Sequence, residues 1–260
     1  MSEQVLTERE DGIAVITINR PQTLNALDMD TLAALGNAFG SAEADPEVRV
    51  IIFTGAGKKA FVAGGDIADL NARNGLRHYF ELGERLHRVF RRIEISDKPT
   101  IAAVNGFALG GGTELVLCTD IRFAAKSASF GLPEINLGLF PGAGGTQRLL
   151  RQISLCKAKE LMFTGSRISA EEAERLGLIN KVVADDSLMD EVRSLALTIA
   201  RKSPLVLKLL KRAVNDGGEM PLGAALRHEQ AMIGLVLDSA DAHEGCAAFL
   251  EKRSARFTGS

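Results

Sequence analysis

Short apolar runs alternate with glycine-rich turns and helix-like segments in the first half of the chain, and this alternation restricts the fold more than any other feature. Three runs rich in β-branched residues have the length and character of strands, and they lie at residues 13–18, 50–53 and 101–104. The alternation of strand, turn and helix from residue 13 to residue 124 predicts an α/β core with its helices outside the sheets.

Turn and capping residues mark the first elements. Asp11-Gly12 is a turn dipeptide directly before the first apolar run, which predicts a hairpin of two early strands. Asp28 is a suitable N-cap for a helix from residue 29 to about residue 42, ending before Asp45-Pro46. A further apolar run at residues 115–118 indicates that another helix begins there.

Beyond Gln152 the pattern becomes helical. Ser169 and Glu172 have the spacing of a capping box, and Gly177 marks a helix stop. Four longer segments with apolar periodicity follow at residues 188–202, 204–214, 222–237 and 241–253. The last two carry more apolar surface than a free tail should expose. We therefore expect this helical lobe to pack on the core or on a neighbouring subunit.

Composition excludes several classes of protein. With 260 residues and 46% hydrophobic content, the chain can bury one large core or one core and a smaller lobe. A formal net charge of −2 gives no overall attraction to nucleic acid or to anionic membranes. The three cysteines lie far apart in sequence and predict neither a zinc site nor a disulfide framework. The first residues lack a signal-peptide pattern, so we expect a cytoplasmic protein without membrane association.

Two glutamates lie between glycine-rich turns. Glu114 follows the triple glycine at residues 110–112, and Glu134 precedes another glycine turn at residues 141–146. A glycine backbone lets N–H groups approach a ligand, and a helix N-terminus at that point favours an oxyanion. The turn at residues 61–66 has so little side chain that its backbone can line the same pocket. Paired carboxylates beside such a site suit proton transfer at an activated carbonyl compound, because one takes a proton while the other gives one.

These motifs occur in an order that resembles the enoyl-CoA hydratase/isomerase (crotonase) family over nearly the whole chain, and bacterial enoyl-CoA hydratases in particular. The matching segments are Asn19-Arg20-Pro21, Leu24-Asn25-Ala26-Leu27, residues 61–66, Ala103-Val104-Asn105-Gly106, residues 110–114, Asp120, Leu132-Pro133-Glu134, residues 141–148 and Glu251-Lys252-Arg253. The ordered set is specific, whereas the triple glycine alone is weak evidence. The resemblance implies a crotonase-like ββα spiral core at residues 1–195. It also implies a C-terminal helical region at residues 196–260 for oligomerisation and site cover.

The resemblance also implies an activity. An enoyl-CoA hydratase is a lyase that adds water across the 2,3-double bond of a trans-2-enoyl-CoA, as in the β-oxidation of fatty acids, and gives a 3-hydroxyacyl-CoA. The backbone N–H groups of Ala63 and Gly111 are implied to form the oxyanion hole for the thioester oxygen. Glu114 is expected to orient the water and accept its proton. Glu134 is expected to protonate the α-carbon.

The remaining implied contacts concern the substrate and the assembly. The residues expected to bind the substrate or its coenzyme A are Asn25, Ala26, Leu27, Gly64, Gly65, Asp66, Gly110, Pro133, Gly142, Phe249 and Lys252. Coenzyme A is part of the substrate, so neither a separate cofactor nor a metal ion is expected. The resemblance further implies a homotrimer or a hexamer made of two trimers.

Several alternatives stand beside these assignments. A Δ3,Δ2-enoyl-CoA isomerase can work with a Glu134-type carboxylate alone, although the presence of Glu114 argues against it. A hydratase for a branched, cyclic or aromatic-pathway acyl-CoA would use the same residues. Asp66 could equally cap the helix that follows it. Ala68 stands where hydratases often carry a lysine, so a phosphate contact from that position is not carried over.

An interaction with RNA is the alternative from a different class. Arg77, Arg85, Arg88, Arg91 and Arg92 form a basic face on a helix expected at residues 76–93. The same helix has an apolar stripe and acidic residues four positions before two of these arginines, which favours an ordinary solvated helix. Nucleic acid is therefore not an expected partner.

Overall fold

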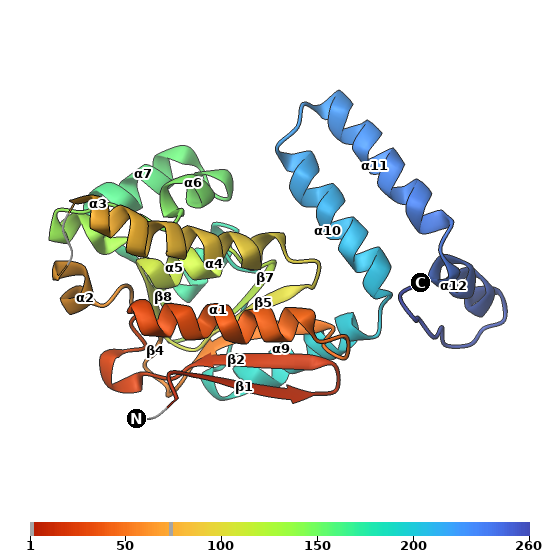
Figure 1. Ribbon diagram of the computed structural model, residues 1–260, viewed down its shortest axis with the longest axis horizontal. Coiled ribbons are helices and arrows are strands. Elements are labelled where there is room, and N and C mark those ends of the chain that lie inside the picture. Colours follow the sequence, from red (N-terminus) through yellow and green to blue (C-terminus); the bar gives the residue numbers. More distant parts are fainter. Residues whose placement is uncertain (1–2, 73–74) are drawn as a thin grey trace.

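The computed structural model describes residues 3–72 and 75–260, and in this part of the chain two β-sheets are surrounded by helices (Figure 1). The larger sheet has the order β1-β2-β3-β5-β7-β10 and the smaller one the order β4-β6-β8-β9. The larger sheet consists of β1 (Val5–Glu10), β2 (Ile13–Ile18), β3 (Val50–Gly55), β5 (Thr100–Val104), β7 (Ile121–Ala125) and β10 (Lys181–Val183). The smaller sheet consists of β4 (Ala60–Val62), β6 (Phe107–Leu109), β8 (Ser129–Gly131) and β9 (Arg167–Ser169).

The helices connect these strands. Those in the first half are η1 (Pro21–Thr23), α1 (Met29–Ala44), α2 (Ile67–Asn71), α3 (Gly75–His78), the π-helix η2 (Tyr79–Gly83), α4 (Glu84–Ile95) and α5 (Gly111–Leu117). Those around the middle are η3 (Pro133–Leu137), α6 (Gly145–Arg148), η4 (Leu149–Arg151), α7 (Leu155–Thr164), α8 (Ala170–Arg175) and η5 (Asp185–Ser187). The last four are α9 (Leu188–Ala200), α10 (Pro204–Gly218), α11 (Leu222–Leu237) and α12 (Ala240–Leu250).

The predicted N-terminal hairpin is confirmed. β1 and β2 run antiparallel about Asp11 and Gly12, whose φ angles are positive at 51° and 77°. The remaining strands of the larger sheet run parallel, with Ile13 of β2 opposite Val50 of β3. Parallel neighbours require a crossover connection. This requirement accounts for the helices between the strands.

Successive strands alternate between the two sheets. β3, β5 and β7 belong to the larger sheet, while β4, β6 and β8, which follow them in the chain, pair in parallel in the smaller sheet. Helices close each repeat, with α2 to α4 after β4, α5 after β6, and η3 to α7 after β8. The predicted α/β spiral of ββα repeats is therefore confirmed.

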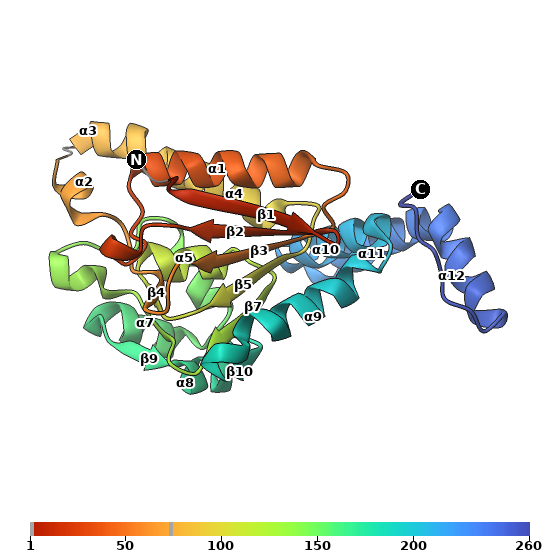
Figure 2. The same cartoon turned by 90° about the horizontal axis from the view of Figure 1, so that it is seen from below.

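The central strands of the larger sheet are buried on both faces. Ala14 and Ile16 of β2 belong to a core that includes α1 and α4, whereas Ile13 and Val15 belong to a second core with α9. Figure 2 shows α1 and α9 on opposite sides of the sheet. Burial on both faces explains why these strands are continuous apolar runs in the sequence.

Capping determines the helix boundaries as predicted in two places. The Asp28 carboxylate accepts a hydrogen bond from the Thr31 N–H at 2.8 Å, and α1 begins at the next residue after Asp28. The Ser169 hydroxyl accepts one from the Glu172 N–H at 3.2 Å at the start of α8. Both bonds satisfy N–H groups that lack an intrahelical acceptor.

Two other predictions about elements are only partly right. The helix predicted at residues 76–93 is divided into α3, η2 and α4, because a π-helical turn interrupts the regular α-helical bonding. The side chains of Arg77 and Tyr79 lie outside the described part. β9 and β10 occur in the region predicted to be helical, since strands of three residues are too short to show a periodicity.

The C-terminal helices extend away from the sheets (Figures 1 and 2). The boundary predicted at residue 195 falls inside α9, which packs on the larger sheet along its whole length. α10 is tied to the core by Lys211, which binds Asp120 at 2.7 Å, and α11 packs beside α10. Within one chain, Leu235 of α11 and Phe249 of α12 stay 58% and 82% exposed. Among the described residues, no helix is long and apolar enough to cross a membrane.

Close packing of α5 against β4 at Gly112 makes this glycine a test of the fold. A Cβ placed on Gly112 would lie 1.9 Å from the Val62 carbonyl oxygen, whereas one on Gly218, at the end of α10, has no atom within 4 Å. We predict that Gly112→Ala lowers the free energy of unfolding by about 3 kcal/mol, the upper range for overpacked cores. Gly218→Ala, the matched control, should leave it nearly unchanged. Denaturant unfolding measures both, and equal stability of the two variants would contradict this packing.

Candidate active site

Two glycine turns meet beside the smaller sheet. β4 and β6 are parallel neighbours, so the turns that follow them, at residues 63–65 and 110–112, lie at the same edge. A Cβ placed on Gly111 would lie 3.8 Å from the backbone N of Gly65 and 3.9 Å from Leu27 Cδ1. These are van der Waals distances, so the two turns are direct neighbours.

The backbone N–H groups that are free at this junction are not the same pair as the N–H groups of Ala63 and Gly111, which the resemblance implied for the oxyanion hole. The Ala63 N–H donates to the Leu24 carbonyl at 3.1 Å, so it is not available to a ligand in this conformation. Gly65 is two residues further on, and its N–H has no acceptor among the described residues. Gly111, the other predicted donor, is the first residue of α5, and no described residue accepts from its N–H. The two backbone N–H groups without a described acceptor at this junction are therefore those of Gly65 and Gly111, whereas the N–H of Ala63 is occupied.

α5 begins earlier than the sequence predicts. Its N-cap is Gly110, with φ 50° and ψ −122°, whereas the apolar run suggested a start near residue 115. Thr113 holds this first turn in place, because its hydroxyl donates to Ala108 O at 2.6 Å and accepts from Gly131 N–H at 3.2 Å. Glycine is a poor helix former, so packing rather than local preference fixes the helix start.

Glu114 lies in the first turn of α5 and is 2% exposed. Its Oε1 accepts hydrogen bonds from the Ala143 N–H at 2.7 Å and the Gly145 N–H at 2.8 Å. Burial raises the pKa of this carboxyl, although the two N–H groups and the nearby Arg148 charge act in the opposite direction. The loop at residues 143–145 thus fixes one oxygen and orients the carboxylate.

Glu134 lies in η3, directly after Pro133, and its carboxylate lies against the same glycine turn. A Cβ placed on Gly110 would lie 2.8 Å from Glu134 Oε1, and the positive φ of 50° at this position favours glycine as well. Glu134 Oε2 is buried and has no hydrogen-bond partner among the described residues. Burial, assisted by the charge of Glu114, raises the pKa of Glu134 to about 7. At neutral pH this group can therefore either hold or release a proton.

The segment at residues 25–27 borders both turns. The Leu27 N–H donates to Gly64 O at 2.9 Å, and the Leu27 carbonyl accepts from Asp66 N–H at 2.9 Å. The Asn25 side chain is completely buried and binds the backbone of Arg20, Ala56 and Ala60. Asn25 therefore shapes the loop, while the backbone of Ala26 and Leu27 lies beside the turns.

Asp66 caps α2, which was one of its two predicted roles. Its carboxylate accepts from the N–H groups of Ala68 and Asp69 and from Arg20 at 3.2 Å. Burial acts to raise the pKa of Asp66, but the backbone bonds and the Arg20 guanidinium outweigh it and hold this pKa below its ordinary value. The group is therefore ionised at neutral pH.

Three further predicted residues lie at increasing distance from the turns. Gly142 is adjacent to Ala143 and lines an open cavity of about 910 Å³ in front of α4. Phe249 in α12 and Lys252 directly after it lie at the opposite end of the molecule from α2 and α6 (Figure 1). A single chain thus does not bring its own Phe249 or Lys252 to the carboxylates.

Sequence reasoning missed the support of the loop that holds Glu114. Arg148 donates to Ala143 O at 3.0 Å and binds both oxygens of Glu94 in α4 at 2.9 Å each. A Cβ placed on Gly144, whose φ is 105°, would meet Arg148 Nη1 at 1.9 Å. Arg148 and Glu94 are 54 residues apart, so no local pattern indicates their pairing.

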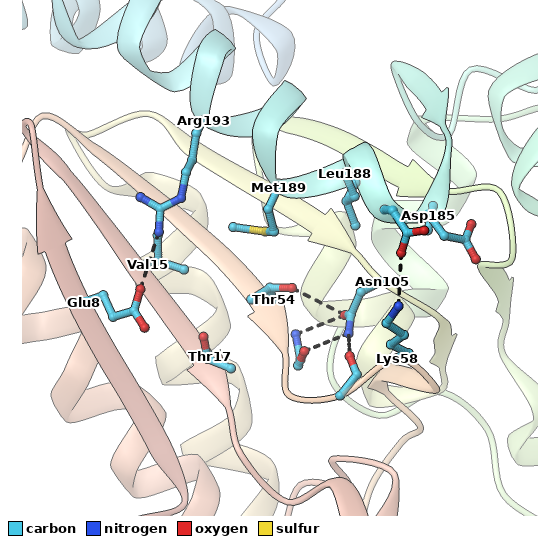
Figure 3. A pocket seen from close by; sticks show the side chains of 14 residues that line it. Glu8, Val15, Thr17, Thr54, Lys58, Asn105, Asp185, Leu188, Met189 and Arg193 are labelled. Atoms are coloured by element: carbon cyan, nitrogen blue, oxygen red, sulfur yellow. Dashed lines mark hydrogen bonds and ion pairs between the residues drawn. The ribbon is translucent and has the colours of Figure 1, made fainter.

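A second cavity, of about 350 Å³, lies between the ends of β2 and β3 and helix α9 (Figure 3). Its charged side chains form two pairs, since Lys58 binds Asp186 at 3.0 Å and Arg193 binds Glu8 at 3.4 Å. Asn105 binds the backbone of Gly55 with both side-chain polar atoms. This cavity contains neither carboxylate, and the candidate site lies at the glycine turns.

Free backbone donors beside one buried and one half-buried carboxylate, on a spiral of ββα repeats, define an enzyme that polarises a carbonyl group and moves protons next to it. A family model described as enoyl-CoA hydratase/isomerase matches residues 8–260. The chain belongs to this family.

Individual proteins that are similar to this chain belong to the same family. The chain is 46% identical over 251 residues to the short-chain-enoyl-CoA hydratase of Clostridium acetobutylicum, covering 96% of this chain and 95% of that one. It is 46% identical over 257 residues to the crotonyl-CoA hydratase of Syntrophomonas wolfei, covering 98% of each. The crystal structure of an enoyl-CoA hydratase subunit from Geobacillus kaustophilus superposes with a TM-score of 0.94 at 42% identity and covers 100% of both chains.

The raised pKa of Glu134 predicts a pH-dependent stability. Its pKa is about 7 when folded and near the ordinary 4.5 when unfolded, so its favourable contribution is complete below pH 4.5 and is lost as the pH rises through 7. Glu134→Gln cannot ionise, so it should raise the melting temperature relative to wild type more at pH 8.5 than at pH 4.5. Calorimetry at both values tests this, and an equal difference at both would contradict a raised pKa.

Arg148 is predicted to act as a positioning residue through the loop. Arg148→Met should lower kcat/KM about 10- to 100-fold, because small displacements of catalytic groups have effects of this size. It should also move the acidic limb of the pH profile upwards, since a positive charge near Glu114 is lost.

Two variants separate positioning from stability. Arg148→Lys should restore the acidic limb. Arg122→Lys, at a buried arginine that binds the carbonyls of Leu117 and Thr119, should lower the melting temperature without moving that limb. If the acidic limb of the pH profile does not move in Arg148→Met, the role of Arg148 is purely structural.

Proposed function

We propose that this chain hydrates the 2,3-double bond of a trans-2-enoyl-CoA, the reaction of the hydratases in its family, with Glu114 and Glu134 as the catalytic residues. The observation that carries the proposal is the pair of differently held carboxylates at one glycine turn. Glu114 is fixed by two N–H donors, while Glu134 has a buried oxygen without a described partner and a pKa of about 7. From this difference in environment we assign Glu114 as the general base and Glu134 as the general acid.

The thioester oxygen binds between the N–H groups of Gly65 and Gly111. Negative charge grows on this oxygen as the double bond is attacked, so donors fixed in advance stabilise the transition state more than the ground state. α5 adds its positive end at the same point. Loss of one such donor costs about 2.7–4 kcal/mol of activation free energy in enzymes where it has been measured.

Each glutamate then has one proton to move. Glu114 Oε1 is held by the loop, which leaves Oε2 to orient a water and take its proton as the water oxygen bonds to C3. Glu134 gives its proton to C2 as the enolate collapses. The proton that Glu114 gains balances the one that Glu134 loses, so the net reaction adds one water.

Coenzyme A is part of the substrate in this proposal. Its pantetheine passes along the backbone of Ala26, Leu27, Gly64 and Gly65, where Asp66 and Arg20 hold the loops together. Phe249 and Lys252 contact it only from another subunit, because α12 of the same chain lies at the far end. We therefore propose a trimer, alone or paired as a hexamer, and the exposed apolar surface of α10–α12 supports this assembly.

The alternatives are weaker. An isomerase needs no second carboxylate, yet Glu114 is buried and held by two hydrogen bonds. RNA binding along α4 is disfavoured because Arg91 and Arg92 form ion pairs with Glu94 and Glu43 at 2.7 Å each. Localisation in the cytoplasm remains part of the proposal.

Crotonyl-CoA tests the hydratase directly, through loss of the absorbance of its conjugated thioester. Glu114→Gln and Glu134→Gln should each lower kcat by about 10²- to 10⁴-fold, the usual contribution of a general acid or base, with little change in acyl-CoA affinity. Glu172→Gln, at an exposed ion pair on α8, is the matched control and should behave as wild type. Unchanged turnover in either of the first two variants would refute the assignment.

A further inference from the structure

If the proposed function holds, the open cavity in front of α4 offers the acyl chain room beyond the reacting carbons, because the cavity borders the loop that binds Glu114. Gly142, at the edge of this cavity, directly precedes Ala143, whose N–H binds Glu114 at 2.7 Å. Leu139 and Phe140 line the cavity and are 46% and 75% exposed. The volume of about 910 Å³ is ample for an acyl chain.

The opposite wall of this cavity is charged. Glu84 lies three and four residues before His87 and Arg88 on α4, and these two lie four and three residues before Arg91, so all four line the cavity from one side of the helix together with His78 of α3. Arg91 is engaged with Glu94 at 2.7 Å. The side chains of Arg88, His78 and His87 have no ion pair or hydrogen bond with any residue that the structure describes.

Charge on this wall is predominantly positive. The two arginines that line this wall face a single lining carboxylate, Glu84, which lies one turn before Arg88, and the two histidines add hydrogen-bonding groups. A purely hydrocarbon acyl tail gives Arg88 nothing to bind, whereas a carboxylate offers it a bidentate partner. Leu139 and Phe140 suit the methylene groups between that carboxylate and the double bond.

We propose that the acyl site accepts 2-enoyl-CoA substrates with a distal carboxylate, that is, the CoA monothioesters of unsaturated dicarboxylic acids, and that Arg88 recognises the carboxylate. His78 and His87 supply further hydrogen-bond donors. The recognition is separate from the chemistry, because none of these residues touches the reacting atoms. It sets the substrate class of the reaction proposed above.

Binding of two saturated thioesters tests this recognition without turnover. Adipoyl-CoA and hexanoyl-CoA have six-carbon acyl groups and differ in the terminal carboxylate, and neither can be hydrated. Calorimetry with wild type should give tighter binding of adipoyl-CoA. Arg88→Gln should weaken adipoyl-CoA binding about tenfold or more, the effect of one lost charge-assisted hydrogen bond, and leave hexanoyl-CoA unchanged.

Two neighbours on α4 serve as matched controls. Arg85→Gln removes the same charge from a residue that does not line the cavity and should leave the affinity ratio unchanged. Glu84→Gln removes the opposing carboxylate and should increase the preference for adipoyl-CoA. Equal weakening of both ligands by Arg88→Gln would mean that Arg88 binds the phosphates of coenzyme A, and tighter binding of hexanoyl-CoA by wild type would mean a neutral pocket. Either result overturns the proposal.

Turnover separates this proposal from the hydratase itself. Wild type should hydrate the CoA monothioester of trans-2-hexenedioic acid with a higher kcat/KM than trans-2-hexenoyl-CoA, and Arg88→Gln should reverse this order. Hydration of crotonyl-CoA together with unselective binding of the two saturated ligands would reject the carboxylate site alone. Selective binding without hydration of any enoyl-CoA would reject the hydratase and retain the site.

Discussion

The approach of two backbone segments, the turn after β4 and the first turn of α5, is the constraint on which the rest of the structure depends. A Cβ on Gly112 would lie 1.9 Å from Val62 O, and one on Gly110 would lie 2.8 Å from the Glu134 carboxylate. Glycine at these positions lets the smaller sheet, η3 and the N-terminus of α5 converge, and the N–H groups of Gly65 and Gly111 are free at one point. The parallel pairing of β4 with β6 produces this convergence, so the fold and the candidate site have the same origin.

The same convergence gives two glutamates different environments. Glu114 is enclosed by α5 and by the loop that Arg148 fastens to Glu94, so its position is fixed by hydrogen bonds. Glu134 has a buried oxygen with no described partner, and desolvation raises its pKa to about 7. Burial of an unsatisfied acceptor is unfavourable for folding. We interpret this cost as the consequence of keeping a proton donor ready at neutral pH.

Much of the fold is present in the sequence as local signals. The hairpin at Asp11-Gly12, the Asp28 cap and α11 at Leu222–Leu237 were predictable because turn chemistry, capping and a long apolar period act over a few residues. The start of α5 at Gly111 and the three-residue strands β9 and β10 were not predictable, because tertiary packing overrides weak local preferences. In the candidate site, the glutamates and glycine turns could be named from motif order. The free N–H groups could not be identified from the sequence, because the N–H of Ala63 donates to Leu24, which lies in a loop 39 residues earlier. The pairing of Arg148 with Glu94 could not be predicted either, because the two residues are far apart in the chain.

The central claim is that the two glycine turns polarise a thioester carbonyl. Infrared difference spectroscopy of bound butanoyl-CoA labelled with ¹³C at the thioester carbonyl measures this directly, because the saturated ligand cannot react. Two fixed N–H donors and the α5 N-terminus should lower the carbonyl stretching frequency below its value in water. A frequency equal to that of the free thioester in water would contradict the account, because the carbonyl would then not lie between Gly65 and Gly111.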